Sequence, residues 1–225
     1  MQIKRNIYKF LCISLVLLLP IQVYAQPDSL RRIGGLKIGM DLSRFLVRIW
    51  DPVKSNFEFS LSSDVHKNIY FSTEGGYLRV RFTDEFQSYE SAGYYIRAGG
   101  EYNLFKRAPE ENDLLYIGLL WGYSNFWHKA DNITISDGYW GTGSGSIPRN
   151  DLTANWLEIK AGIRIELFKN WFIGWAIRGR FYMFGKTDPI LEPYLIPGFG
   201  PGDKTTSIGG SYSIAYRFPY RRKKK

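Results

Sequence analysis

The chain has 225 residues, of which 44% are hydrophobic and 17% are aromatic, and its formal net charge is +9. Three of its cations precede residue 26 and five more lie at residues 221–225, so the remainder is nearly neutral and gives no reason to expect a nucleic-acid partner. The single cysteine is Cys12, near the N-terminus. After that point the chain has no thiol for a disulfide, a cysteine metal site or a cysteine nucleophile.

The N-terminal segment has the three parts of a secretory signal peptide. A basic start is followed by an apolar stretch at residues 10–19 and by Ala25, a small residue suited to a cleavage site. The apolar stretch is too short to span a membrane as a helix. We therefore expect residues 1–25 to be cleaved and residues 26–34 to form a short lead-in on the periplasmic side.

The clearest pattern in the chain lies at residues 155–185. From Trp156 to Leu167 polar and apolar residues alternate with a period of two, and after a turn at Lys169-Asn170 the alternation resumes up to Met183. This predicts a hairpin of two long strands with one almost purely apolar face and one charged face. Its strands are longer than those of typical globular sheets and reach the length that a tilted strand needs to cross a bilayer.

Similar alternation predicts six further strands. In chain order the eight expected strands cover residues 36–43, 56–64, 69–82, 94–104, 115–123, 155–167, 171–183 and 206–218. The third strand changes phase, and a bulge at Gly75-Gly76 would restore a single apolar face. Residues 126–154 are expected to form the longest loop, and residues 186–205 form a second long loop.

These strands and connections predict an all-β fold. The connections after the odd-numbered strands are longer than those after the even-numbered ones, and aromatic residues collect near strand ends. Both features are typical of an eight-stranded antiparallel up-and-down transmembrane β-barrel. We expect the barrel at residues 35–218, followed by a basic periplasmic tail at residues 219–225.

The polar face of the strands then lines the lumen. An eight-stranded barrel is just wide enough for its own side chains, and buried charges must be paired. We expect a packed salt-bridge network and not an open pore. Its members would be Lys37, Asp41, Glu58, Glu74, Arg79, Arg97, Glu101, Glu158, Lys160, Arg164, Glu166, Arg178, Arg180 and Arg217.

The last strand, Tyr212-Ser-Ile-Ala-Tyr-Arg-Phe218, resembles the aromatic-ended final strand that the outer-membrane assembly machinery recognises. The chain after residue 25 resembles small eight-stranded outer-membrane β-barrels, in particular a family described as a domain of unknown function. In most relatives the chain ends at the terminal aromatic residue, whereas this one continues with Pro219-Tyr220 and five basic residues. The resemblance implies a location in the outer membrane and a fold, but no particular activity.

Barrels of this kind include structural or adhesive proteins and enzymes that act on lipid A, so the fold does not choose between them. A lipid A acyl-transfer or deacylase site would need a base, and His128, with Ser124 and Asp131 nearby, is the weak candidate. The residue types favour a non-enzymatic structural or surface-interaction role. The third alternative is a secreted lipocalin-like carrier with an apolar cavity.

Further expectations concern ligands and partners. No cofactor is expected. No metal site is expected either, because the acidic residues of the long loop lack the spacing of an oxygen-ligand motif. Tyr139 and Trp140 form a candidate recognition surface in that loop. Outer-membrane lipid, lipopolysaccharide and the assembly machinery are the expected partners, and the basic tail could contact inner-leaflet phosphates or an acidic periplasmic protein.

Overall fold

The computed structural model describes residues 34–44, 51–66, 68–85, 87–105, 112–137 and 141–220. The expected signal peptide, most of the lead-in and the basic residues 221–225 lie outside these ranges. Within the described residues no helix has both the length and the apolar character needed to cross a membrane.

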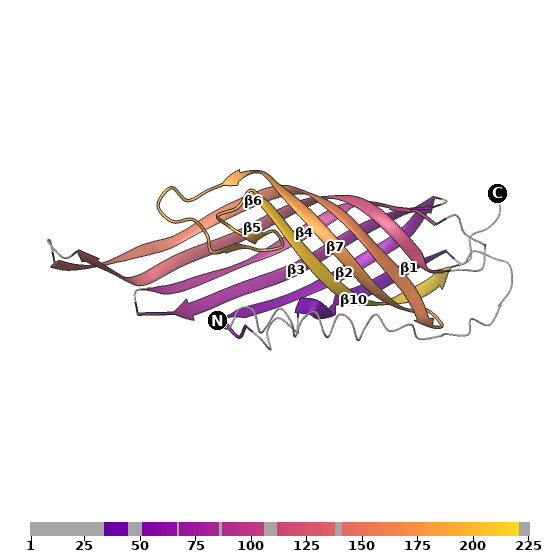
Figure 1. Cartoon of the computed structure of the whole chain (residues 1–225), viewed down its shortest axis with the longest axis horizontal. Helices are drawn as coiled ribbons and strands as arrows, with labels where there is room; N and C mark the ends of the chain where they lie inside the picture. The colour runs from indigo at the N-terminus through magenta and orange to yellow at the C-terminus, as the bar shows by residue number, and fades with distance from the viewer. Residues whose placement is uncertain are drawn as a thin grey trace.

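Eight antiparallel strands close into a barrel (Figure 1), as the alternation predicts. They are β1 (Gly34–Asp41), β2 (Lys54–His66), β3 (Ile69–Thr83), β4 (Ser88–Asn103), β5 (Leu114–Asp137), β6 (Gly141–Phe168), β7 (Trp171–Lys186) and β10 (Thr206–Tyr220). Each strand pairs with its neighbours, and β1 closes the ring by pairing with β10. Two short strands, β8 (Leu195–Ile196) and β9 (Gly200–Pro201), pair with each other in the loop between β7 and β10.

The alternation of side chains determines the two faces of the barrel wall. On β4, Tyr94 is 69% exposed and Ile96 is 52% exposed, whereas their neighbours Tyr95 and Arg97 are only 4% and 0% exposed. The same contrast recurs around the ring, so most charged side chains of the described strands lie inside the barrel and the outer face is largely apolar. This inverts the arrangement of a water-soluble barrel.

The exposed apolar side chains form a continuous band around the outside, which we call the apolar belt. It includes Ile38, Phe59, Leu61, Phe71, Ile96, Ile117, Leu119, Ile163, Ile173, Trp175 and Ile177. Aromatic residues lie at its two margins. At one margin Tyr77 packs against both Phe57 and Tyr94, and at the other Tyr216 packs against both Trp171 and Phe218.

The barrel has two distinct ends, which we call the inner end and the outer end. At the inner end β1 begins beside the end of β10, where Gly34 pairs with Tyr220. The outer end is the opposite end, where β5 joins β6. The inner turns that follow β2 and β6 contain Asn68 and Asn170, each with a φ of 68°. Asparagine tolerates this left-handed conformation better than most residues do, which explains its use in turns this tight.

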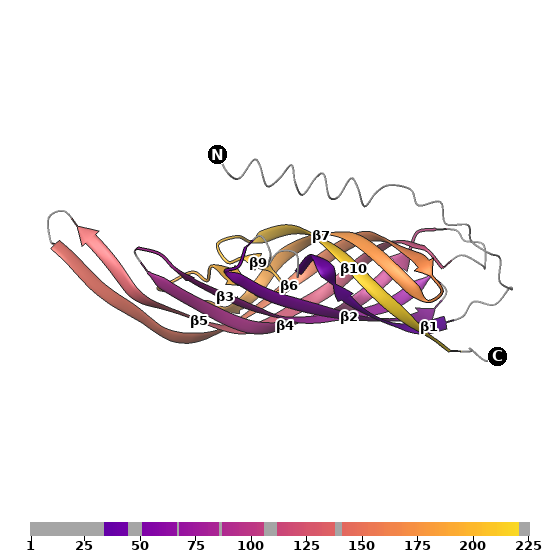
Figure 2. The same ribbon diagram turned by 90° about the horizontal axis from the view of Figure 1, so that it is seen from below.

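The outer end differs from the expected long loop at residues 126–154. There β5 and β6 continue as a two-stranded ribbon, paired from His128 and Asn150 out to Asp137 and Gly141. This ribbon projects well beyond the rest of the barrel (Figures 1 and 2). In its far part the Gly- and Ser-rich residues 143–146 are exposed, so this stretch has no apolar alternation to mark it as a strand.

Two further expectations are wrong, one about the third strand and one about the connections. No bulge occurs at Gly75-Gly76, because the pairing of β3 with both neighbours continues without a shift across these residues. The outer connection at residues 84–87 is shorter than the inner connection at residues 104–113. The asymmetry between the two ends therefore comes mainly from strand extension and from the loop at residues 187–205.

Candidate functional site

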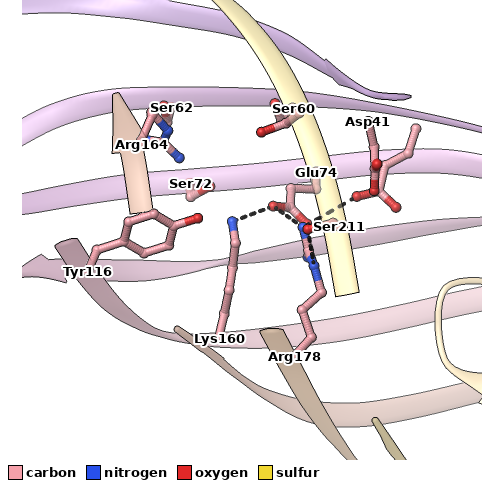
Figure 3. A pocket seen from close by; sticks show the side chains of 12 residues that line it. Asp41, Ser60, Ser62, Ser72, Glu74, Tyr116, Lys160, Arg164, Arg178 and Ser211 are labelled. Carbon is pink, nitrogen blue, oxygen red and sulfur yellow. Dashed lines mark hydrogen bonds and ion pairs between the residues drawn. The ribbon is translucent and has the colours of Figure 1, made fainter. Parts of the chain in front are cut away.

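The interior of the barrel is almost filled by side chains. Among them lies a polar cavity of about 20 Å³, lined by the charged residues Asp41, Glu74, Lys160, Arg164 and Arg178 and by several serines (Figure 3). A single water molecule needs roughly 10–15 Å³ of such space. This cavity therefore has room for one or two water molecules.

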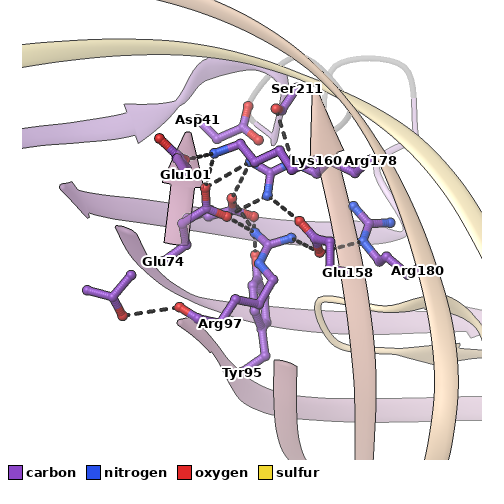
Figure 4. A network of polar contacts seen from close by, with 12 residues as sticks. Asp41, Glu74, Tyr95, Arg97, Glu101, Glu158, Lys160, Arg178, Arg180 and Ser211 are labelled. Carbon is purple, nitrogen blue, oxygen red and sulfur yellow. Dashed lines mark hydrogen bonds and ion pairs between the residues drawn. The ribbon is translucent and has the colours of Figure 1, made fainter. Parts of the chain in front are cut away.

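The centre of the lumen is a network of carboxylates and guanidinium groups (Figure 4). Arg97, from β4, lies 3.2 Å from Glu158 and 2.9 Å from Glu74, and it also pairs with Glu58. Arg178, from β7, donates to Glu158 at 2.8 Å and to Glu74 at 3.1 Å. Each carboxylate meets at least two cations, which is the condition under which buried charges are tolerated.

The network extends along the lumen in both directions. Toward the inner end, Lys160 donates to Glu74 at 2.7 Å and to Glu101 at 2.9 Å. Toward the outer end, Arg180 donates to Glu158 at 3.2 Å and to the backbone oxygen of Phe199 at 2.9 Å. Because these contacts join strands on opposite sides of the barrel, they brace the wall from within.

A separate polar cluster closes the inner end. Arg217 donates to Asn112 at 2.7 Å, to Asn170 at 3.2 Å and to Glu166 at 3.1 Å. Glu166 also accepts the backbone N–H of Asn170 at 2.7 Å. The cluster therefore joins β10, β6 and the turn between β6 and β7.

The loop at residues 187–205 folds inward and closes the outer end; we call it the plug loop. Its Phe199 is fully buried, with its ring 6.0 Å from the rings of both Trp156 and Tyr182. Gly198 has a φ of 77°, and a Cβ atom there would lie 2.5 Å from the Tyr95 ring. Only glycine combines this conformation with such close packing.

The plug loop is also held by polar contacts. Asp188 accepts hydrogen bonds from Asn150 at 3.0 Å and from the backbone N–H of Ile190 at 2.9 Å, and its carboxylate lies 2.9 Å from His128 Nε2. The hydrogen bond from Asn150, followed by those from Ile190 and His128, holds the pKa of Asp188 well below its usual range. The other ring nitrogen of His128 lies 3.4 Å from the hydroxyl of Tyr89.

Residues 4–223 match the family described as a domain of unknown function (DUF6048). The chain belongs to this family. The structural resemblance extends to two solved barrels. Ail, the attachment invasion locus protein of Yersinia pestis, has 12% identity and a TM-score of 0.42, with 84% of this chain and 100% of that chain covered. Neisserial surface protein A has 10% identity and a TM-score of 0.38, with 83% of this chain and 96% of that chain covered. No curated protein matches the sequence.

For this DUF6048 protein the structure places most of the expected lumen residues inside the barrel. Buried side chains are those of Lys37, Asp41, Glu58, Glu74, Arg97, Glu101, Glu158, Lys160, Arg164, Arg178, Arg180 and Arg217, and Glu166 is half-buried. The ammonium group of Lys37 lies over the rings of Tyr70 and Phe172, at 5.1 and 5.0 Å.

Arg79 is the exception, because the structure places it outside the barrel. Its side chain is 46% exposed and pairs with Glu90 on the outer surface. The expected bulge would have turned Arg79 inward. Without it, β3 runs straight and directs Leu78 and Val80 into the lumen.

His128 is fully buried, with both ring nitrogens in contact with neighbouring side chains. It does not join Ser124 and Asp131, since Ser124 donates to the backbone oxygen of Tyr94 and Asp131 pairs with Lys129. A lipid on the outside of the barrel cannot reach this imidazole, so the geometry supports an anchoring role. Tyr139 and Trp140 lie outside the described residues.

Sequence reasoning missed several members of the polar interior. Arg44 follows β1 in a single helical turn at residues 42–44 and lies 3.5 Å from Asp41 and 3.3 Å from Glu58. A strand pattern with a period of two gives no signal for it. Asn112 and Asn170, which accept hydrogen bonds from Arg217, belong to connections, where the alternation also ends.

Proposed function

We propose that this protein is an integral outer-membrane β-barrel with a closed lumen and a non-enzymatic role in envelope structure or surface interaction. The observation that carries the proposal is the inverted wall, with the apolar belt outside and a paired charge network inside. Exposing the belt to water would be unfavourable because of the hydrophobic effect. Soluble proteins accordingly rarely present a contiguous apolar surface on this scale.

The dimensions of the belt support a lipid surrounding. On β4 the outward side chains are apolar or small from Tyr94 to Tyr102, and on β5 from Leu115 to Tyr123. Each of these stretches covers nine residues, which matches the nine to eleven that a tilted strand needs to span a bilayer. Aromatic margins are characteristic of the two membrane interfaces.

The orientation follows from the inequality of the two ends. We place the inner end, with its tight turns and both strand termini, in the periplasm, and the ribbon and plug loop outside the cell. Near its end the final strand carries the Tyr216 and Phe218 aromatic pair, which suits recognition by the assembly machinery. The basic residues 221–225 would then be available to inner-leaflet phosphates or to an acidic periplasmic partner.

The alternatives receive less support. A lipocalin-like carrier needs an apolar cavity, whereas the cavity inside the described barrel is lined by charged side chains, serines and one tyrosine. A lipid A enzyme needs a base that lipid can approach, and His128 is buried under the plug loop. The projecting ribbon and the plug loop instead give the outer end a surface suited to contacts with other molecules.

Quenching of tryptophan fluorescence by brominated lipids tests the proposal. Two variants would each retain a single tryptophan, Trp175 in the belt or Trp156 in the lumen, with the others replaced by phenylalanine. After insertion into vesicles, we expect strong quenching for Trp175 and weak quenching for Trp156. Equal quenching, or a protein that stays in solution without detergent, would overturn the proposal.

Conductance across planar bilayers tests the closed lumen separately. Because the network and the plug loop fill the interior, the inserted protein should produce no steady ion conductance. A stable open channel from the wild-type protein would show that the lumen is a pore.

A further inference from the structure

The outward face of β3, β4 and β5 changes character just beyond the aromatic margin of the belt. Tyr77 and Tyr94 pair across β3 and β4 at the margin, with ring centroids 4.8 Å apart. Arg79 is the next outward-facing residue along β3, about 7 Å farther on at 3.3 Å per residue. Arg81 follows it, paired with Glu90 of β4, which pairs in turn with Lys129 of β5.

These residues form what we call the basic cluster: Arg79, Arg81 and Lys129 around Glu90. Arg79 donates to Glu90 through Nε at 3.2 Å and Nη2 at 2.6 Å, and Arg81 donates through Nη2 at 2.8 Å. Lys129 lies 3.8 Å from Glu90 and 3.2 Å from Asp131. The two arginines thus share the carboxylate of Glu90, whereas the nearer carboxylate partner of Lys129 is Asp131.

Glu90 organises the cluster. Partial burial alone would raise its pKa, but the hydrogen bonds from Arg79 and Arg81 outweigh burial and lower it, so the carboxylate is ionised at neutral pH. The arginine side chains remain 46% and 63% exposed. Their guanidinium groups are therefore oriented by a fixed anion and still open to a second one.

We propose that the basic cluster binds the phosphate groups of outer-leaflet lipid, with the acyl chains of the same lipid lying against the apolar belt. This inference rests on the proposed function, since it requires the belt to be in the membrane. It would explain why Arg79 and Arg81 lie on the outer wall next to the belt. Five other arginines of the described strands are buried inside the barrel, namely Arg97, Arg164, Arg178, Arg180 and Arg217.

Continuity with the belt favours a lipid over a soluble anion. Arginine pairs with phosphate through two parallel hydrogen bonds, and the Tyr77 and Tyr94 margin lies where an interfacial aromatic girdle is expected. A lipid would satisfy both features at once. The neighbouring Arg149 lies 4.7 Å from the Trp127 ring but pairs with Asp151, so it adds little net charge.

Lipid binding by the purified protein in detergent micelles, followed by native mass spectrometry, tests the inference. The probes are bisphosphorylated lipid A and the same lipid after removal of both phosphates. We expect the wild-type protein to bind the phosphorylated form at least tenfold more tightly. The R79A/R81A variant should lose about tenfold in affinity for it, because each basic residue near a charged lipid surface contributes about fivefold and Glu90 already offsets part of that.

Matched variants distinguish a specific phosphate site from a general effect of positive charge at the outer end. The K186A/K204A variant removes two cations elsewhere at the outer end and should bind as the wild type does. Arg79→Lys with Arg81→Lys keeps both charges but loses the paired hydrogen bonds, so its affinity should lie between those of the wild type and of R79A/R81A. E90Q should bind the phosphorylated lipid more tightly because it removes a competing anion. Inorganic phosphate at the same concentration should not displace the lipid.

Several results would overturn the inference. These are equal binding of the two lipids, unchanged binding by R79A/R81A, an equal loss in K186A/K204A, or displacement by inorganic phosphate. If R79A/R81A fails to fold, as judged by the migration of unheated protein on a gel, E90Q decides, since unchanged or weaker binding would contradict a phosphate site. A wild-type protein that inserts into vesicles but shows no phosphate preference refutes this inference alone, whereas failure to insert refutes the proposed function.

Discussion

His128 Nε2 lies 2.9 Å from Asp188 Oδ2, although one residue belongs to β5 and the other to the plug loop. The same carboxylate accepts hydrogen bonds from Asn150 of β6 and from the backbone of Ile190. A single side chain therefore joins the start of the plug loop to the barrel wall. The stability of the closed outer end should depend on it.

The D188A variant should release the plug loop while leaving the barrel folded. A hydrogen bond to a charged group contributes about 1.5–3 kcal/mol, so the amides of Ile190 and Leu191 should exchange at least tenfold faster in hydrogen–deuterium exchange. Asp203 lies in the same loop and is exposed, so D203A is the matched control and should show little change. Unaltered exchange in D188A would mean that other contacts, such as the packing of Phe199 and its hydrogen bond from Arg180, hold the loop.

Acidification should have the same effect as removing the carboxylate. The pKa of Asp188 is lowered in the folded protein, so its stabilising contribution is complete above the unfolded pKa of about 3.9 and is lost as pH falls through the lower, folded value. Exchange of the plug loop, corrected for its intrinsic pH dependence, should be constant from pH 7 to 5 and increase below about 4. The D188A variant should lack this step, and a transition near neutral pH would point to a different group.

The lumen network makes the barrel sensitive to loss of a single carboxylate. Glu158 accepts hydrogen bonds from Arg97, Arg178 and Arg180, and all four side chains are buried. Removing one partner of a buried ion pair costs about 3–5 kcal/mol because it leaves uncompensated charge. E158A should lower the free energy of unfolding by about that amount in a urea titration of the protein in lipid vesicles.

The control for E158A is D151A. Asp151 pairs with Arg149 at 3.1 Å, but both side chains are more than half exposed. Such a surface pair contributes about 0–1 kcal/mol, so D151A should have little effect on unfolding. Similar losses in the two variants would show that the network does not contribute to stability through its burial.

Alternation with a period of two was sufficient to predict all eight barrel strands and the side of the wall that most charges occupy. It worked because each strand separates an apolar surrounding from a charged interior, so every second residue carries the signal. It failed at the outer end, where residues 141–147 form a strand with no apolar face. The backbone pairing of the ribbon leaves no trace in side-chain type.

The functional contacts that the sequence did not reveal join distant segments. Asp188 reaches His128 across sixty positions of the chain, and Arg178 reaches Glu74 across more than one hundred. Arg79 was misplaced because Ser72 and Glu74 share a parity with Leu78, which suggested a bulge. The lumen instead becomes apolar toward the plug loop, so Leu78 and Val80 belong inside and the change of phase is real.

Two glycines on adjacent strands provide a final test of how tightly the outer half of the lumen is packed. Gly122 faces inward, and a Cβ atom there would lie 2.0 Å from the buried ring of Trp156, whereas Gly100 faces outward with nothing within 4 Å of its Cβ position. Trp156 in turn supports Phe199 of the plug loop. G122A should therefore lower the free energy of unfolding by about 1–3 kcal/mol and shift the fluorescence of Trp156.

G100A adds the same methyl group to a neighbouring strand without a clash. Because alanine restricts the unfolded chain more than glycine does, this variant should be neutral or more stable by up to about 1 kcal/mol. The difference between the two variants thus isolates the contact with Trp156 from the general effect of replacing glycine in a strand. If both variants unfold at the same urea concentration, the Trp156 ring has room to move, and the outer half of the lumen is less tightly packed than the contacts of Phe199 indicate.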